Sequence, residues 1–243
     1  MSGIVVDALS KRFYTPEPVQ AVDALSFTCS PGEVFGLLGP NGAGKTTTLR
    51  MLSTLLTPDS GAARVAGHDL RAAPRAVRAS IGYVSTTTGL YGRLTARELL
   101  ATFARLQGVA DPRGRAEDLI ARFDITPFAD LRCDRLSTGM KQKVSIARAM
   151  VADPPVLILD EPTTGLDVLV AQSFLAEIRR ARDEGRCVLF STHIMSQAER
   201  VCDRVGVMHK GRMLACGTLE ELRAQTGRHY LEDIFLALVG ERP

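Results

Sequence analysis

Short apolar runs alternate along this chain with segments in which apolar residues recur at helical spacing. Continuous apolar runs bounded by turn residues are typical of buried strands, and a recurrence every three or four residues is typical of helices. The pattern predicts strands at 33–39, 79–85, 155–161 and 186–193, a helix at 46–56, and a hairpin at 204–217 that turns at Lys210-Gly211. Strands that alternate with helices in this way indicate an α/β protein.

The pattern changes between about residues 90 and 150, where segments 94–108, 115–125 and 137–151 all have helical periodicity. We expect a single domain over 1–243, with a helical subdomain inserted into its sheet core. The expected parts are a core of 1–88 and 151–220, a helical subdomain of 89–150, and a helical tail of 221–243. The tail carries one apolar stripe, which could bind a partner but is expected to pack on its own domain: Leu231, Ile234, Phe235, Leu238 and Val239.

Composition narrows the function classes only a little. Apolar residues make up 45% of the 243, enough for a substantial core, and the net charge of +3 is too small for broad non-specific nucleic-acid binding. The five cysteines form no C-x-x-C pair and do not cluster with the four histidines, so we expect reduced thiols and no zinc site. The N-terminal residues do not read as a signal peptide, and no apolar run is long enough to span a bilayer.

The stretch GPNGAGKTT, residues 39–47, satisfies the pattern G-x-x-x-x-G-K-[ST] of a phosphate-binding P-loop. Its glycines let successive backbone N–H groups turn toward phosphate oxygens, and the helix that follows adds the positive end of its dipole. Lys45 supplies a cation for the β- and γ-phosphates, and Thr46 supplies a hydroxyl for Mg²⁺. The sequence therefore predicts a nucleotide site formed by Gly39, Pro40, Asn41, Gly42, Ala43, Gly44, Lys45, Thr46 and Thr47.

A second element, VLILDEP, places two acidic residues at the end of a predicted buried strand. Asp160 is suited to hold Mg²⁺ together with Thr46, and Glu161 is suited to polarise the attacking water. Capping a helix or pairing with a surface lysine is the competing interpretation of Glu161. A GTPase would carry an N-K-x-D base reader, and this chain has none.

The stretch LSTGMKQK, residues 136–143, resembles the signature sequence of the ATP-binding-cassette (ABC) ATPases. With the P-loop, the acidic strand, GLD at 165–167 and His193 after a strand, the chain carries nearly the whole set of family motifs in order. The resemblance covers roughly residues 3–220. It implies the P-loop NTPase fold of ABC ATPases, with a RecA-like mixed sheet and an inserted helical subdomain, and it implies an enzyme that hydrolyses ATP.

The resemblance also implies how the site is completed. ABC ATPases form a head-to-tail homodimer when ATP is bound, so Ser137 and Gly139 would reach the γ-phosphate of the partner copy. His193 would contact the γ-phosphate as a catalytic residue beside Glu161 and Lys45. Asp167 would link the two sites across the dimer.

Two positions have competing assignments. Phe13 is the first choice for stacking on adenine, with Tyr14 as the alternative. The family usually has a glutamine after the strand IGYV, and here Thr86 stands at that place, so direct metal contact from this residue is doubtful. The segment 86–91 could still act as a flexible joint that couples the ATP site to a membrane partner.

Several stretches resemble one branch of the family more closely, the ATPase subunits of bacterial sodium-extruding (Nat-type) exporters. STTTGLYGRLT, STHIMSQAERVCDRVGVMHKGR and LEDIFLALVG carry this finer match, which drug-exporting subunits share. It implies a peripheral subunit at the cytoplasmic face of the membrane, with a separate transmembrane permease and no nucleic-acid partner. Sodium is the first candidate cargo, and a drug or lipid is the alternative cargo. A soluble ABC ATPase of DNA repair, chromosome structure or translation is the competing function.

Overall fold

The computed structural model of the chain describes residues 3–14, 17–85 and 89–240. The strands are β1 Ile4–Phe13, β2 Val19–Cys29, β3 Val34–Leu38, β4 Ser60–Val65, β5 His68–Asp69, β6 Ile81–Ser85, β7 Val156–Asp160, β8 Cys187–Thr192, β9 Arg204–His209 and β10 Arg212–Gly217. The helices are α1 Lys45–Leu52, α2 Pro74–Ala79, α3 Ala96–Leu106, α4 Pro112–Arg122, α5 Thr138–Ala149, α6 Val168–Asp183, α7 Met195–Val201, α8 Leu219–Thr226 and α9 Leu231–Val239, with 3-10 turns at Thr126–Phe128 and Cys133–Arg135.

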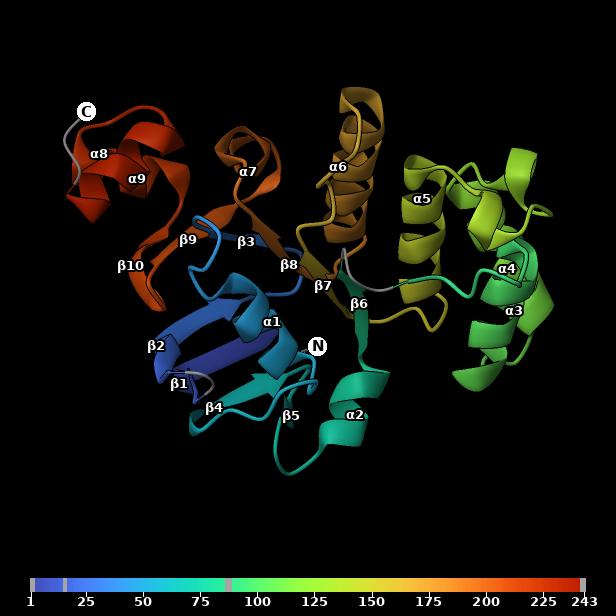
Figure 1. The fold of residues 1–243 in the computed structure, drawn as a ribbon, viewed down its shortest axis with the longest axis horizontal. Helices are drawn as coiled ribbons and strands as arrows, with labels where there is room; N and C mark the ends of the chain where they lie inside the picture. Colours follow the sequence, from blue (N-terminus) through green and yellow to red (C-terminus); the bar gives the residue numbers. More distant parts are fainter. Residues whose placement is uncertain (1–2, 15–16, 86–88, 241–243) are drawn as a thin grey trace.

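The described strands form two sheets (Figure 1). One is antiparallel, in the order β2-β1-β4-β5, and the other has the order β10-β9-β3-β8-β7-β6. The second sheet is parallel except for β10, which pairs with β9 as the second arm of the predicted hairpin. The predicted strands near 33–39, 79–85, 155–161 and 186–193 are all present in it, each shorter by one to two residues at its ends.

The two faces of the parallel sheet are covered by different layers, which explains why its central strands are apolar throughout. Along β7, Val156 and Ile158 join a core shared with α1 and the antiparallel sheet, whereas Leu157 and Leu159 join a core shared with α6 and the helices beyond it. β8 alternates in the same way. Every residue of β3, β7 and β8 is buried as a result.

Helix α1 lies between the two sheets and ends earlier than the sequence predicts. Leu49, Met51 and Leu52 are buried in the core that also holds the antiparallel sheet. The helix stops at Leu52 rather than near residue 56 because Thr54 takes a left-handed backbone with φ 59° and the chain turns there. The apolar periodicity continues past this turn, so the pattern of apolar residues does not indicate where the helix ends.

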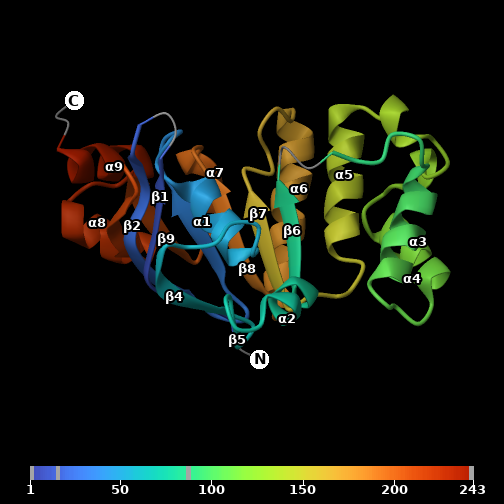
Figure 2. The ribbon, with the colours of Figure 1, turned by 60° about the horizontal axis from the view of Figure 1, so that its bottom comes forward.

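Helices α3, α4 and α5 lie together at one end of the molecule, with α5 between α6 and the α3–α4 pair in both views (Figures 1 and 2). Their starts follow ordinary capping chemistry. Thr95 forms a capping box with Glu98 at α3, Asp111 accepts a hydrogen bond from an N–H of α4, and Ser137 does so at α5.

The C-terminal helices α8 and α9 pack on the β9–β10 end of the parallel sheet (Figure 1). Leu231 and Ile234 are buried, and Phe235 and Leu238 pack against the same cluster, so this part of the predicted apolar stripe is covered by its own chain. The backbone N–H of Leu231 donates to the Glu199 carboxylate, which joins α9 to α7. No helix in the described part of the chain has the length and apolarity needed to cross a membrane.

Candidate ATP-binding and hydrolysis site

The P-loop leaves strand β3 at Leu38 and enters α1 at Lys45, as the sequence predicts. Gly44 has φ 101°, and a Cβ there would lie 2.3 Å from the carbonyl oxygen of Ala21, so only glycine fits. The β9–β10 turn braces the loop from behind. The N–H of Gly211 donates to the carbonyl of Ala43, and the carbonyl of Gly211 accepts from the N–H of Asp23.

A cleft of about 440 Å³ opens over this loop. The lining contains seven of the nine predicted P-loop residues, the acidic residue Glu161, and four residues that the sequence analysis did not select. The full lining is Val19, Gln20, Ala21, Asn41, Gly42, Ala43, Gly44, Lys45, Thr46, Thr47, Glu161 and Lys210. The N-terminus of α1 points its free N–H groups at this space, an arrangement that favours phosphate.

Lys45 is 4% exposed, and its ammonium group has three oxygen partners within the protein. Its Nζ donates to the carbonyl oxygens of Gly39 at 2.7 Å and Pro40 at 3.1 Å. It also forms an ion pair with Oε1 of Glu161 at 3.1 Å. Gly39 and Pro40 therefore hold the lysine rather than line the cleft.

Thr46 and Asp160 lie together on the α1 side of the parallel sheet. The Thr46 hydroxyl donates to Oδ1 of Asp160 at 3.0 Å, and the Ser191 hydroxyl donates to the same oxygen at 2.8 Å. Burial raises the pKa of Asp160 above its usual 3.8, against these two hydrogen bonds, and the charge of Glu161 adds to the rise. A hydroxyl and a buried carboxylate that meet at one point are hard oxygen donors, so this pair fits the ligand chemistry of Mg²⁺.

Glu161 is the centre of the charged contacts in the cleft. Its Oε2 lies 3.0 Å from Nδ1 of His193 and accepts a hydrogen bond from Thr164 at 3.3 Å, while Oε1 faces Lys45. Burial acts to raise the pKa of Glu161, but the hydrogen bond and charge of Lys45 outweigh it with help from His193, so the pKa lies below its usual 4.5. Glu161 is therefore ionised at neutral pH, the state that a general base requires.

The signature residues lie apart from this cleft within one copy of the chain. Ser137 caps α5 by accepting from the N–H of Met140, and Gly139 sits against Val170 of α6, where a Cβ would lie 3.2 Å from the valine side chain. Asp167 caps α6 by accepting from the N–H of Val170 at 3.0 Å. Ser137, Gly139 and Asp167 are absent from the lining of the cleft described above.

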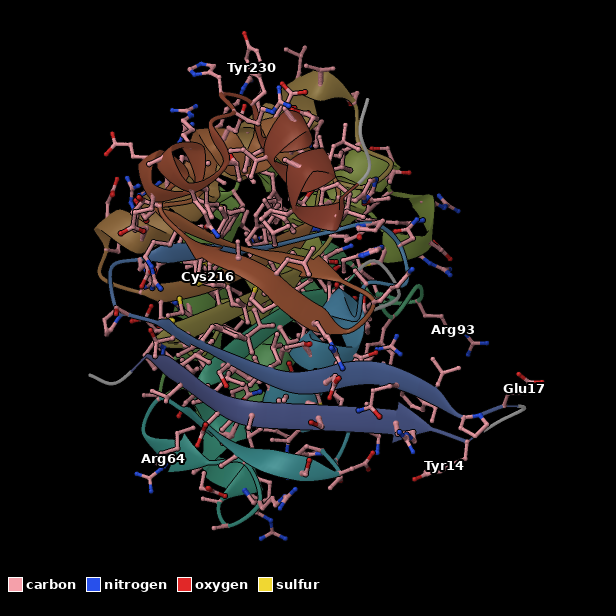
Figure 3. All side chains as sticks on the ribbon, turned by 90° about the vertical axis from the view of Figure 1, so that its left-hand side faces the viewer. Tyr14, Glu17, Arg64, Arg93, Cys216 and Tyr230 are labelled. Carbon is pink, nitrogen blue, oxygen red and sulfur yellow. The ribbon has the colours of Figure 1, made fainter. Side chains whose placement is uncertain are left out.

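The aromatic candidates for adenine lie at the end of β1. Phe13 is 39% exposed and pairs across the hairpin with Val19, which does line the cleft. Tyr14 is 71% exposed and projects at the far end of the strand (Figure 3). Neither side chain lines the cleft, so adenine stacking by Phe13 stays a prediction. Thr86 lies outside the residues that the structure describes.

Sequence reasoning missed Ser191, Lys210 and the β2 residues of the cleft wall. Ser191 stands two positions before His193 in FSTH, and a polar residue at the end of a buried strand was the available signal. The sequence predicts Lys210 as a residue of the hairpin turn, with no role in the site, whereas the structure places it in the wall of the cleft. The alternating pattern of residues 19–29 was the signal for β2, which supplies Val19, Gln20 and Ala21.

Comparison with known proteins agrees with this geometry. The sequence profile of the family described as "ABC transporter" matches residues 22–164, more than half of the chain. The chain is 41% identical over 238 residues to the ABC transporter ATP-binding protein NatA of Bacillus subtilis (strain 168), across 96% of this chain and 97% of NatA.

A second relative is the daunorubicin resistance ATP-binding protein DrrA3 of Streptomyces coeruleorubidus, 38% identical over 242 residues, across 99% of this chain and 75% of DrrA3. A solved structure described as the ATP binding subunit of an ABC transporter is 33% identical and superposes with a TM-score of 0.88, over 98% of this chain and all of that one. The predicted fold and family are thereby confirmed. The chain belongs to the ABC transporter family, in which it is an ATP-binding subunit that hydrolyses ATP.

Proposed function

We propose that this chain is the ATPase subunit of a bacterial ABC exporter and that its preferred cargo is sodium. The observation that carries the ATPase part is the meeting of Lys45, Thr46, Asp160, Glu161 and His193 at the carboxyl edge of the parallel sheet, beside the P-loop cleft. Ligands of open α/β sheets bind at this edge.

Each residue has a chemical task in the proposed hydrolysis. Lys45 and the P-loop N–H groups hold the β- and γ-phosphates, and Thr46 with Asp160 would hold Mg²⁺. The ion would neutralise charge on the phosphate oxygens. Glu161 polarises the water that attacks the γ-phosphorus. ADP leaves as the bond between the γ-phosphorus and the oxygen that bridges the β- and γ-phosphates breaks. His193, whose Nδ1 lies 3.0 Å from Oε2 of Glu161, orients that carboxylate and would contact the γ-phosphate.

We propose that the working unit in the ATP-bound state is a homodimer. Within one copy, the signature residues Ser137 and Gly139 do not line the cleft, so they are placed to complete the site of a second copy. Ser137 begins helix α5, and the N–H groups of that first turn suit a γ-phosphate. Asp167 begins α6 next to Val168 and Leu169, which are 71% and 79% exposed, an apolar surface that a second copy would cover.

A separate transmembrane permease is proposed to dock on a groove of about 430 Å³ between β6, α3 and α5. Tyr91, 64% exposed, and Leu55, 62% exposed, give the groove apolar walls. Arg148 lies 5.3 Å from the Phe103 ring and donates to the carbonyl of Gly89, a residue of the segment 86–91 that is proposed as the joint to the ATP site. The groove suits an apolar segment of the permease that carries a carboxylate, at the cytoplasmic face of the membrane.

Sodium is proposed as cargo because this chain is 41% identical to NatA over 96% of its length and because three of its stretches resemble the sodium-extruding branch. The likeness to DrrA3 favours a drug as the second candidate. Everted membrane vesicles that contain this chain and the membrane subunit encoded beside it decide between them. ATP-driven sodium uptake that is lost in Glu161→Gln supports the proposal. ATPase activity without sodium movement rejects sodium and leaves an exporter of another cargo.

A further inference from the structure

Ser191 is the last residue but one of β8 and the first residue of the stretch STHIMSQAERVCDRVGVMHKGR, but it is not among the predicted site residues. It pairs in parallel register with Asp160 of β7, and its exposure is 0%. A hydroxyl with no access to water must find its hydrogen-bond partners inside the protein. The partners that it finds are the two acidic residues of the site.

The Ser191 hydroxyl makes one contact with each acidic residue. It donates its proton to Oδ1 of Asp160 at 2.8 Å, the same oxygen that accepts from Thr46. It accepts the backbone N–H of Glu161 at 3.0 Å. The carbonyl oxygen of Ser191 also accepts from that N–H, at 3.2 Å, so Ser191 binds the Glu161 peptide with both its side chain and its backbone.

The second contact bears on the direction of the Glu161 side chain. Successive residues of a strand point to opposite faces, so continued strand geometry would place Asp160 on the α1 side and Glu161 on the other side. Glu161 instead has φ 47°, a left-handed backbone conformation that is costly for any residue other than glycine. This turn brings its carboxylate to Lys45 on the same side as Asp160.

We propose that Ser191 is a positioning residue, which orients the Asp160 carboxylate toward Thr46 and holds the left-handed turn that aims Glu161 into the cleft. The inference rests on the hydrolysis site proposed above. Alanine at this position would leave Oδ1 of Asp160 with one donor and the Glu161 N–H with the backbone carbonyl alone. Both carboxylates would then sample other directions, while the P-loop and Lys45 keep their contacts.

The test is Ser191→Ala in the full chain, with ATPase rates over a range of ATP and Mg²⁺ concentrations. Partners of metal-binding residues are worth about 10- to 100-fold in metal affinity or activity, so we expect kcat to fall, and the Mg²⁺ needed for half-maximal rate to rise, within that range. ADP binding in EDTA reports the P-loop alone and should change by less than about threefold. Ser191→Cys fills nearly the same space and keeps a weak hydrogen-bond donor. Its kcat and its Mg²⁺ requirement should lie between those of Ser191→Ala and of the wild type.

Ser80→Ala is the matched control, since Ser80 donates a 2.9 Å hydrogen bond to Ala76 in α2, remote from the cleft. Thermal unfolding of each variant separates loss of fold from loss of positioning. Equal kcat and equal Mg²⁺ dependence in Ser191→Ala and wild type would overturn the inference. An equal loss of ADP binding in EDTA would overturn it too, because a general structural role predicts that result. Absence of Mg²⁺-dependent hydrolysis in the wild type would reject the proposed function instead.

Discussion

The ion pair between Lys45 and Glu161 makes a quantitative prediction about nucleotide affinity. The ammonium group of Lys45 already has three oxygen partners inside the protein, so a phosphate oxygen must compete with at least one of them. Glutamine at position 161 would replace the ionic acceptor with a neutral one. Hydrogen bonds to charged groups exceed neutral ones by about 1 to 2 kcal/mol, so Glu161→Gln should bind nucleotide about 5- to 30-fold more tightly than the wild type, because phosphate then competes with a weaker acceptor for Lys45.

Two nucleotides separate this effect from dimer formation. ADP lacks the γ-phosphate that the proposed dimer holds, so tighter ADP binding to Glu161→Gln at low protein concentration reports the released Lys45. The affinity of Glu161→Gln for ATP should increase more than its affinity for ADP. With ATP the variant should also form a species of twice the monomer mass in light scattering after size exclusion. The hydrolysis rate should fall about 100- to 10,000-fold because water activation is lost.

Glu177→Gln is the control for removing a partly buried, paired carboxylate outside the site. Glu177 is paired with Arg122 at 3.3 Å and its side chain is 21% exposed, against 18% for Glu161. Its ADP affinity should match the wild type. ADP affinity in Glu161→Gln that is no higher than in the wild type would show that the ion pair does not compete with nucleotide, and the argument from Lys45 would be wrong.

Three further predictions follow from the same site and from the cysteines. Lys45→Ala should lose at least about 100-fold in nucleotide affinity in the same titration, and unchanged binding would reject its phosphate role. Asp160→Asn should end Mg²⁺-dependent hydrolysis yet raise the thermal midpoint without metal, because a carboxylate disfavoured by burial is removed. Since the pKa of Asp160 is raised in the fold, this gain should shrink as pH falls through the folded pKa, and a lower midpoint at neutral pH would contradict it. Among the five thiols, exposed Cys216 (Figure 3) should react first with a thiol reagent, while the buried pair Cys29 and Cys187 should react only on unfolding, as peptide mass mapping can check.

The sequence predicted the parallel sheet well because its strands are buried on both faces. Short apolar runs such as those within 155–161 and 186–193 favour a strand over a buried helix because of their length and the turn residues that bound them. The antiparallel sheet was harder to find. β1 and β2 carry polar residues on their exposed face and register shifts along their pairing, so their apolar pattern is weak.

The motifs located the site, but not the contacts that hold it together. A P-loop pattern fixes the order of Lys45 and Thr46, and it cannot show that Lys45 faces Glu161 in the nucleotide-free chain. That contact depends on the left-handed backbone of Glu161 and on Ser191 from another strand. Such features are set by tertiary pairing, which apolar periodicity does not encode.

The brace behind the P-loop has a consequence for protein synthesis. The residue that hydrogen-bonds the carbonyl of Ala43 is Gly211, which is made 168 residues after Ala43. At about 5 to 20 residues per second, roughly 10 to 30 seconds separate the two on the ribosome. This brace can therefore form only after residue 211 has been made, and the apolar strands of the growing polypeptide must be protected by other means until then.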